Sequence, residues 1–277
     1  MHARHRKAAG LLLLTSLFAP AAFAADKPAG SKPPPDPTED ALMMSAGFLS
    51  SHPDLRFRLN GQKQFNEGNY ADAFSFFRRA AWYGDKPSQG MVAEMLWTGK
   101  GVAQDRPLAY AWMDLAAERG YEGFVTHRER YWSALDETER TRAIEVGQEL
   151  YAQYGDAASE PRLTAVLRRE RARQTGSRTG YTGSLKIYVP GPGGTYEQID
   201  GSKYYDERYW DPKEYRALQD SIWARAYTGK VDVGPVEQIG TDDNPNSRIP
   251  ATAPQVDVAE PTTPEPDDAI LQNPQPH

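Results

Sequence analysis

The stretch AFSFFRRAAWYG (residues 73–84) returns 36 positions later as AYAWMDLAAERG (residues 109–120). Small residues coincide at the first, eighth, ninth and twelfth positions, and bulky residues coincide at the second, fourth and fifth. Small side chains let two helix backbones approach closely, and bulky side chains one turn away fill the groove beside them. Because one helical hairpin cannot bury its apolar face alone, the repeat predicts hairpins that stack on one another.

Helical periodicity extends on both sides of this repeat. Proline is tolerated in the first turn of a helix, and Pro53 opens the first periodic segment. Asp136 and Glu139 form a plausible capping pair between the last two helices. A first helix is expected from Pro53 to the break at Gly68-Asn69, and further helices over 71–83, 88–97, 107–119, 122–135 and 137–154, which places a mainly α-helical repeat domain at residues 53–155.

The loops between these helices carry a motif as well. Gly99-Lys100-Gly101-Val102 is followed by Gln104-Asp105, and Gly68-Asn69-Tyr70 separates the first two helices. With Phe57, Gly61, Ala73, Phe77 and Ala80, this pattern resembles the tetratricopeptide superfamily, and more closely its Sel-one-like repeat branch. The resemblance covers about residues 54–155, and the third hairpin (122–155) lacks the loop motif. Its repeat positions are Gly61, Ala73, Ala80, Gly99, Gly101, Ala109 and Ala116.

The resemblance implies a short α-α superhelix that mediates protein–protein contacts. In such families the first helix of each hairpin lines a concave groove, with side chains that flank the small positions Gly61 and Ala93. The side chains expected there are Arg58, Gln62, Phe65, Glu94 and Trp97. The alternative is that these five are ordinary surface or packing residues.

Residues 156–239 have a different composition. Six arginines between positions 162 and 178 indicate a basic helix that ends near Gln174. It would either dock an acidic partner, an anionic lipid or the chain's own acidic tail, or pair with acids elsewhere in the fold. Beyond it, ten aromatic residues lie within 181–227, with a strand expected at 185–189 and a helix from Asp211 to about Ala226. We therefore expect a small aromatic-rich α+β unit.

Two alternative functions rest on this aromatic-rich unit. Tyr204, Tyr205 and Trp210 would bind glycan or peptidoglycan if exposed, although aromatic residues also suffice as the core of a small unit. A cell-wall hydrolase would need a carboxylate pair. The acids available for it are Asp200, Asp206, Glu207, Asp211 and Glu214.

The two ends of the chain are low in packing residues. Residues 1–24 have a basic start, an apolar run at 11–18 and small residues at Ala22 and Ala24, the layout of a signal peptide. Residues 25–52 form a proline-rich linker, within which 39–50 have the pattern of one short amphipathic turn or helix. Residues 240–277 hold eight prolines and seven acids, which predicts a disordered acidic tail. The mature protein is expected in the periplasm or secreted, without a membrane span after the signal is removed.

Composition excludes several chemistries. The chain has no cysteine, and outside its ends its histidines are His52 and His127 alone, so thiolate catalysis and Cys-ligated zinc are excluded and a histidine triad is disfavoured. A net charge of −6 gives no general attraction for nucleic acid. No catalytic, metal-binding or cofactor-binding motif is found. The sequence therefore favours a module that binds a protein or peptide in the cell envelope.

Overall fold

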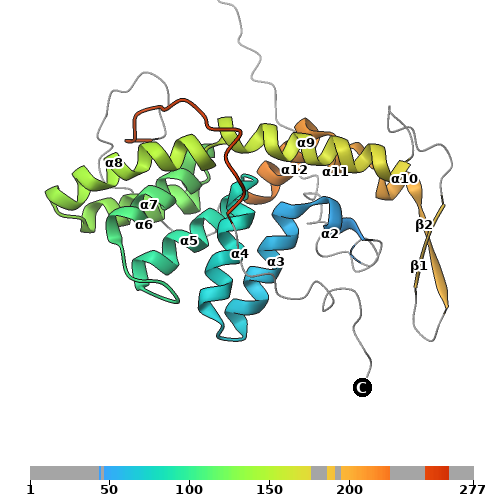
Figure 1. Ribbon diagram of the computed structural model, residues 1–277, viewed down its shortest axis with the longest axis horizontal. Coiled ribbons are helices and arrows are strands. Elements are labelled where there is room, and N and C mark those ends of the chain that lie inside the picture. The colour runs from blue at the N-terminus through green and yellow to red at the C-terminus, as the bar shows by residue number, and fades with distance from the viewer. Residues whose placement is uncertain (1–43, 45–46, 176–185, 191–194, 225–246, 262–277) are drawn as a thin grey trace, which may run out of the picture. The chain divides into compact units, whose positions relative to one another are not determined.

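The computed structural model describes residue 44 and residues 47–175, 186–190, 195–224 and 247–261. Within these ranges the chain is mainly helical, with one two-stranded antiparallel sheet (Figure 1). The first nine helical elements are α2 (Phe48–Ser51), α3 (Pro53–Asn66), α4 (Tyr70–Trp82), α5 (Lys86–Thr98), α6 (Arg106–Ala116), the 3-10 turn η2 (Ala117–Arg119), α7 (Glu122–Ala134), α8 (Glu137–Tyr154) and α9 (Asp156–Thr175). After them come β1 (Lys186–Pro190), β2 (Tyr196–Asp200), α10 (Gly201–Tyr204), α11 (Glu207–Trp210) and α12 (Pro212–Trp223).

Aspartates set the starts of several helices. Asp85 and Asp105 accept hydrogen bonds from backbone N–H groups in the first turns of α5 and α6, each at 3.1 Å. Asp136 and Glu139 form the reciprocal capping box at the start of α8 that the sequence predicts. These caps satisfy backbone donors that have no partner inside the helix.

The repeated alanines lie in matching helices. Ala73 and Ala80 belong to α4, Ala109 and Ala116 belong to α6, and all four are fully buried. The same close approach occurs between α3 and α4, where a Cβ added to Gly61 would lie 2.7 Å from the Phe77 ring. Helices α3 and α4 pack together, as do α5 and α6, and α7 and α8 both pack on α6.

The Gly-x-Gly loop fastens α5 to its neighbours. Gly99 ends α5 with a φ of +70°, and Gly101 has a φ of +76°. A Cβ added to Gly101 would lie 2.5 Å from the carbonyl carbon of Tyr70, at the start of α4. The Gln104 amide donates to the Trp97 carbonyl at 2.7 Å. The loop motif therefore has a packing explanation, because only glycine fits the space beside α4.

A second core joins the N-terminal end of the described chain to its aromatic-rich part. Phe48 of α2 is fully buried and meets Tyr204, Tyr209 and Trp210 edge-on. His52 lies 5.1 Å from Trp210, ring to ring. Within the expected linker, residues 48–51 form the short helix α2, partly inside the 39–50 stretch that was expected to form one, and His52 is buried because it completes this aromatic core.

Part of the expected disordered tail is ordered. Residues 247–261 run as an extended segment from α6 and α7, past the end of α8, to α4 (Figure 1). Ile249 is 3% exposed and would touch a Cβ at Gly147. Glu260 pairs with Arg79 at 2.7 Å. The average composition of the tail predicts disorder. Residues 247–261 are nevertheless held in place, because Ile249 packs closely against Gly147 and several polar contacts fix the segment. The rest of the tail lies outside the described residues.

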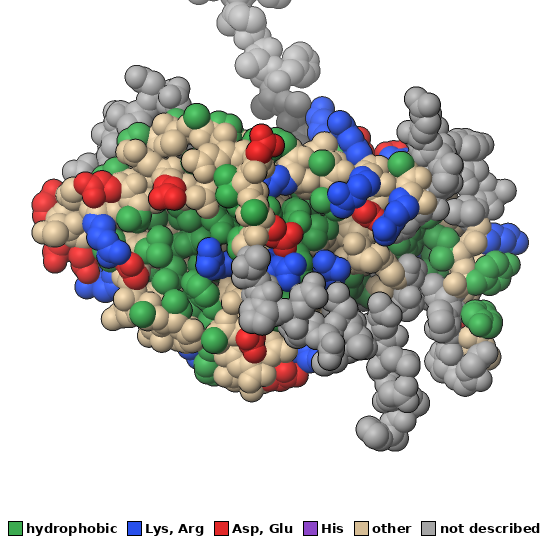
Figure 2. Space-filling view, viewed as in Figure 1, with side chains coloured by type: hydrophobic (Ala, Val, Ile, Leu, Met, Phe, Trp, Pro, Cys, Tyr) green, Lys and Arg blue, Asp and Glu red, His purple; other side chains and the backbone are tan. Residues whose placement is uncertain are grey.

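Figure 2 shows the face that this segment crosses, with apolar side chains gathered in its middle and charged side chains at the end near α8.

The sheet is a simple hairpin in which Tyr188 of β1 pairs with Gln198 of β2. Strand β1 lies where the alternating pattern predicts it, one residue later than expected. Strand β2 has no such apolar alternation, and the sequence did not indicate it.

Candidate binding groove and adjoining polar pocket

A groove of about 540 Å³ lies across α3, α5 and α7. Helices α3 and α5 pack on α4 and α6 respectively, whereas α7 packs on α6 and not on α8, so the expected third hairpin is not a packed pair. Side chains from α4, α6 and α12 complete its wall. The groove is lined by Arg58, Leu59, Gln62, Phe65, Phe77, Pro87, Ser88, Gly90, Met91, Glu94, Met113, Phe124, His127 and Trp223.

The groove is largely apolar, with a few polar groups. Phe65, Met91 and Phe124 are half-buried, so part of each side chain faces the open space. Glu94 accepts a hydrogen bond from the Tyr131 hydroxyl and is the acidic residue of the lining. Partial burial and the nearby Arg130 lower the pKa of His127 below its usual value, although Glu94 opposes the shift. An occupant would therefore meet an apolar floor with one acidic group.

Four of the five residues that the resemblance places in a groove share this lining. Arg58, Gln62 and Phe65 come from α3, and Glu94 comes from α5. Arg58 is not a free charge, because it is 7% exposed and pairs with Asp85 at 3.0 Å.

Trp97, the fifth residue, is not in the groove lining. It stacks on Tyr131 with ring centroids 4.0 Å apart and planes 9° from parallel. The Arg106 guanidinium lies 4.9 Å from its ring centroid. The indole is used to pack α5 on α7, so its contribution to the groove is indirect.

Several groove residues were missed from the sequence. Met91 lies three positions before Glu94, and that spacing puts the two on one helix face, so a signal was present. Phe124 and His127 show the same spacing on α7. Trp223 gave no usable signal, because it comes from α12, far along the chain.

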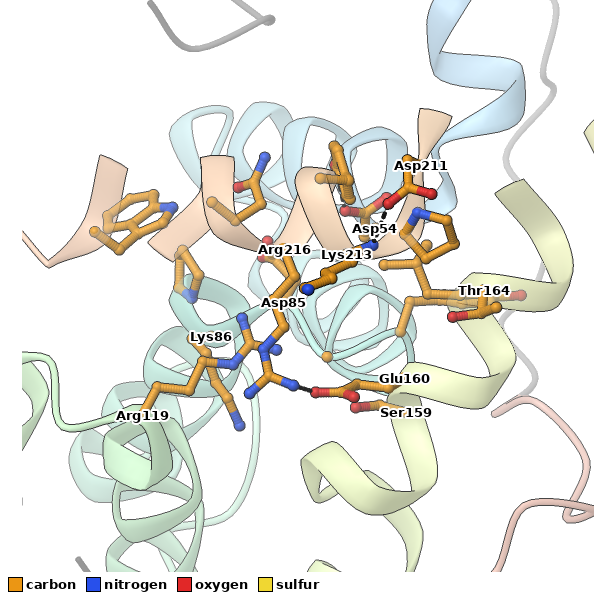
Figure 3. Close-up of a pocket in the computed structure, with 18 of the residues that line it drawn as sticks. Asp54, Asp85, Lys86, Arg119, Ser159, Glu160, Thr164, Asp211, Lys213 and Arg216 are labelled. Atoms are coloured by element: carbon orange, nitrogen blue, oxygen red, sulfur yellow. Dashed lines mark hydrogen bonds and ion pairs between the residues drawn. The ribbon is translucent and has the colours of Figure 1, made fainter. Parts of the chain in front are cut away.

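A second cavity of about 320 Å³ is lined by residues of α3, α5, η2, α9 and α12 (Figure 3). We call it the polar pocket. Its charged lining residues are Asp54, Asp85, Lys86, Arg119, Glu160, Arg168, Asp211, Lys213 and Arg216. In Figure 3, Lys86, Arg119 and Arg216 lie together on one side of the pocket, and Asp54 lies beside Asp211 on the other.

Asp156 is the hub of an ion-pair network behind this pocket. It lies 3.0 Å from Lys86, 2.8 Å from Arg119 and 3.0 Å from Arg216. Burial opposes its ionisation, but the three cations outweigh burial and hold its pKa well below the usual range. Lys86 has a side chain only 1% exposed and also pairs with Glu118 at 2.6 Å. The network connects α5, η2, α9 and α12, which lie far apart in sequence.

Two buried titratable groups lie beside the pocket, two positions apart. Burial lowers the pKa of His52 to about 4, although the Tyr209 carbonyl 2.8 Å from Nε2 opposes the shift. Burial raises the pKa of Asp54 to about 6, although the Tyr215 hydroxyl donates to its Oδ2 at 2.6 Å. Arg58 favours the Asp54 carboxylate and Asp85 disfavours it.

These two shifts have opposite effects on stability between pH 4 and 6.5. The folded state resists protonating His52, so its contribution falls as pH drops through 6.5 towards 4. The folded state binds a proton at Asp54 more tightly than the unfolded chain, so that contribution rises as pH drops from 6 towards 3.8. The two largely offset each other in the wild type.

Replacing Asp54 with asparagine should expose the His52 effect. Between pH 6.5 and 4.5 the Asp54→Asn variant should lose about 2 kcal/mol more unfolding free energy than the wild type. Urea denaturation at the two pH values measures this. Asp72→Asn, at an exposed position of α4, should keep the wild-type pH dependence. Equal slopes for Asp54→Asn and the wild type would show that Asp54 titrates normally.

The aromatic residues considered for glycan binding are in the core. Tyr204, Tyr205 and Trp210 are 1%, 8% and 1% exposed, so their faces cannot stack on a sugar. These three residues instead form part of an aromatic core, which was the alternative expected for this unit. In the described part of 181–227, Tyr188 and Tyr196 of the hairpin are the large exposed aromatic residues.

Four of the five acids considered for hydrolysis have structural partners, and the fifth, Glu214, is an exposed side chain of α12. Asp200 and Asp211 accept backbone N–H bonds at the starts of α10 and α12. Asp206 pairs with Arg208, and that hydrogen bond lowers its pKa, as the bond from Arg171 lowers the pKa of Glu207. A lowered pKa is the opposite of what a general acid needs. Asp206 and Glu207 therefore lack the raised pKa that the general acid of a glycosidase needs.

The arginines of α9 mostly pair within the fold. Arg171 contacts Glu207 at 2.7 Å, and Arg173 contacts Glu170 at 2.6 Å. Arg162 instead stacks on Trp82 and donates to the backbone carbonyls of residues 255 and 256 in the C-terminal segment. Pairing with acids and docking of the chain's own tail therefore both occur.

Comparison with protein-family models, curated proteins and solved structures found no match to this chain. Among the residues that the structure describes, no group of His, Asp and Glu side chains is suited to hold a metal ion. No helix in the described ranges has both the length and the apolar content that a bilayer crossing requires.

Proposed function

We propose that this chain is an exported protein of the bacterial cell envelope whose groove binds an amphipathic helical segment of another protein. The helix pairs α3–α4 and α5–α6 would be units of a tetratricopeptide-like superhelix of the Sel-one-like type. Helices α7 and α8, which both pack on α6, would be its divergent third unit. Residues 1–24 support export, and the Gly99–Asp105 loop supports the repeat type.

The observation that carries this proposal is the composition of the groove. Helices α3, α5 and α7 contribute to one apolar cavity, and its half-buried side chains are flexible or aromatic, as with Met91 and Phe124. Methionine-rich and aromatic surfaces adapt to the apolar face of a partner helix. Glu94 would orient the partner by pairing with a lysine or arginine beside that face.

Selection of binding peptides tests the proposal. A displayed library of amphipathic helices should yield binders with apolar residues every three or four positions and a flanking cation. Their affinity should fall at least tenfold in Gln62→Trp, which fills the groove from an exposed position of α3. Fluorescence anisotropy measures the dissociation constants.

Gln148→Trp is the matched control, because Gln148 is an exposed glutamine of α8 outside the groove lining. It should bind the selected peptides as the wild type does. Peptides that bind Gln62→Trp and wild type equally would place the binding surface elsewhere, and a selection without helical binders would reject the partner class.

A further inference from the structure

The polar pocket contains buried side-chain atoms that have no hydrogen-bond partner among the described residues. Four of them are Asp54 Oδ1, Ser159 Oγ, Gln219 Nε2 and Trp223 Nε1. Ser159 is fully buried, Asp54 is 3% exposed and Gln219 is 8% exposed. Since buried polar atoms in folded proteins are nearly always hydrogen-bonded, their gathering around one cavity indicates that a polar molecule enters it.

The four atoms require both a hydrogen-bond donor and a hydrogen-bond acceptor from a bound molecule. Asp54 Oδ1 accepts hydrogen bonds, and its Oδ2 is already engaged by the Tyr215 hydroxyl. Gln219 Nε2 and Trp223 Nε1 only donate, and the Ser159 hydroxyl does either. A complementary molecule therefore has a donor at one end and an acceptor at the other.

Helix α12 sets the distance between these ends. Tyr215, which holds Asp54, is followed by Gln219 and Trp223 at intervals of four residues, so the three occupy successive turns of one face. One helical turn advances about 5.4 Å. The acceptor of the pocket is thus separated from its donors by about one to two turns, or roughly 5–10 Å.

We propose that the polar pocket binds a small dipolar molecule, of the class of short peptides and long-chain amino acids, through both of its charged ends. The ammonium group contacts Asp54, and the carboxylate contacts Gln219 and Trp223. The pocket volume of about 320 Å³ suits a small ligand. In Figure 3, Asp211 lies beside Asp54, and Lys86 and Arg119 lie on the other side of the pocket, where Glu160 pairs with Arg216.

Titration calorimetry on the full chain with three dipeptides tests both ends. Ala-Ala carries both charges, N-acetyl-Ala-Ala lacks the ammonium, and Ala-Ala-amide lacks the carboxylate. Ala-Ala should bind with a dissociation constant below about 1 mM, and both blocked forms at least tenfold more weakly. No binding of Ala-Ala at about 5 mM, or equal binding of either blocked form, would overturn the proposal.

Two variants assign the ends. Asp54→Asn should weaken Ala-Ala at least tenfold, to the level of N-acetyl-Ala-Ala. Gln219→Leu should remove the preference for a free carboxylate, so that Ala-Ala and Ala-Ala-amide bind equally. If Asp54→Asn fails to fold, this variant alone tests the proposed site. Wild-type selectivity in Gln219→Leu would overturn the assignment. Gln62→Trp, in the separate groove, should bind Ala-Ala unchanged, so failure of this site and failure of the groove are distinguishable.

Discussion

Replacing Gly101 with alanine should destabilise the protein by about 3 kcal/mol. Two costs add at this position. Its φ of +76° is unfavourable for any residue with a Cβ, and the new methyl group would lie 2.5 Å from the Tyr70 carbonyl carbon. That atom is backbone at the start of α4, so relief requires moving a helix. Urea denaturation measures the change in unfolding free energy.

Gly68 provides the matched control for this prediction. Its φ is +85°, but a Cβ added there meets nothing within 4 Å. Gly68→Ala should therefore cost only the conformational part, about 1 kcal/mol. If the two variants lose the same free energy, the loop does not pack against α4 as described, and the meaning assigned to the Gly-x-Gly motif is wrong.

Replacing Asp156 with alanine should have an effect of similar or larger size, about 3–5 kcal/mol. The variant leaves Lys86, Arg119 and Arg216 without the carboxylate they share. Lys86 is the costly one, because its side chain is 1% exposed and retains only Glu118 as a counter-charge. Because Asp156 starts α9, its loss should also loosen the contact of α9 and α12 with the repeat helices.

Thermal unfolding and hydrogen exchange together check this result. The Asp156→Ala variant should unfold at lower temperature, with the earliest loss of protection in α9 and α12. Glu145→Ala removes an exposed carboxylate from α8 and should stay within about 0.5 kcal/mol of the wild type. An Asp156→Ala variant as stable as Glu145→Ala would mean that the buried ion pairs contribute no net stability.

Much of the helical part could be predicted from sequence because its signals are local. The coincidence of Ala73 with Ala109 predicts two matching helices, and both residues are fully buried in α4 and α6. The helix starts expected at 88 and 107 lie within two residues of the observed starts of α5 and α6. Four groove residues followed from the resemblance to tetratricopeptide-like repeats, which implies that side chains flanking Gly61 and Ala93 line a groove.

The rest depends on contacts between distant residues, which local patterns do not encode. Phe48 is buried only because Tyr204 and Trp210 return to meet it. Ile249 is one apolar residue in a proline-rich, acidic segment, and averaging over that segment hid it. The polar pocket had one weak signal. Lys86 begins α5, and a cation is unfavourable at a helix N-terminus unless acids surround it.

We propose that the groove across α3, α5 and α7 receives a partner helix. A photoreactive side chain placed at the position of Met91, in cells that express the protein, would crosslink to that helix. The crosslinked residues of the partner should recur every three or four positions in one amphipathic segment, and Gln62→Trp should abolish the product. No product from position 91, or the same product from position 148 on α8, would contradict the claim.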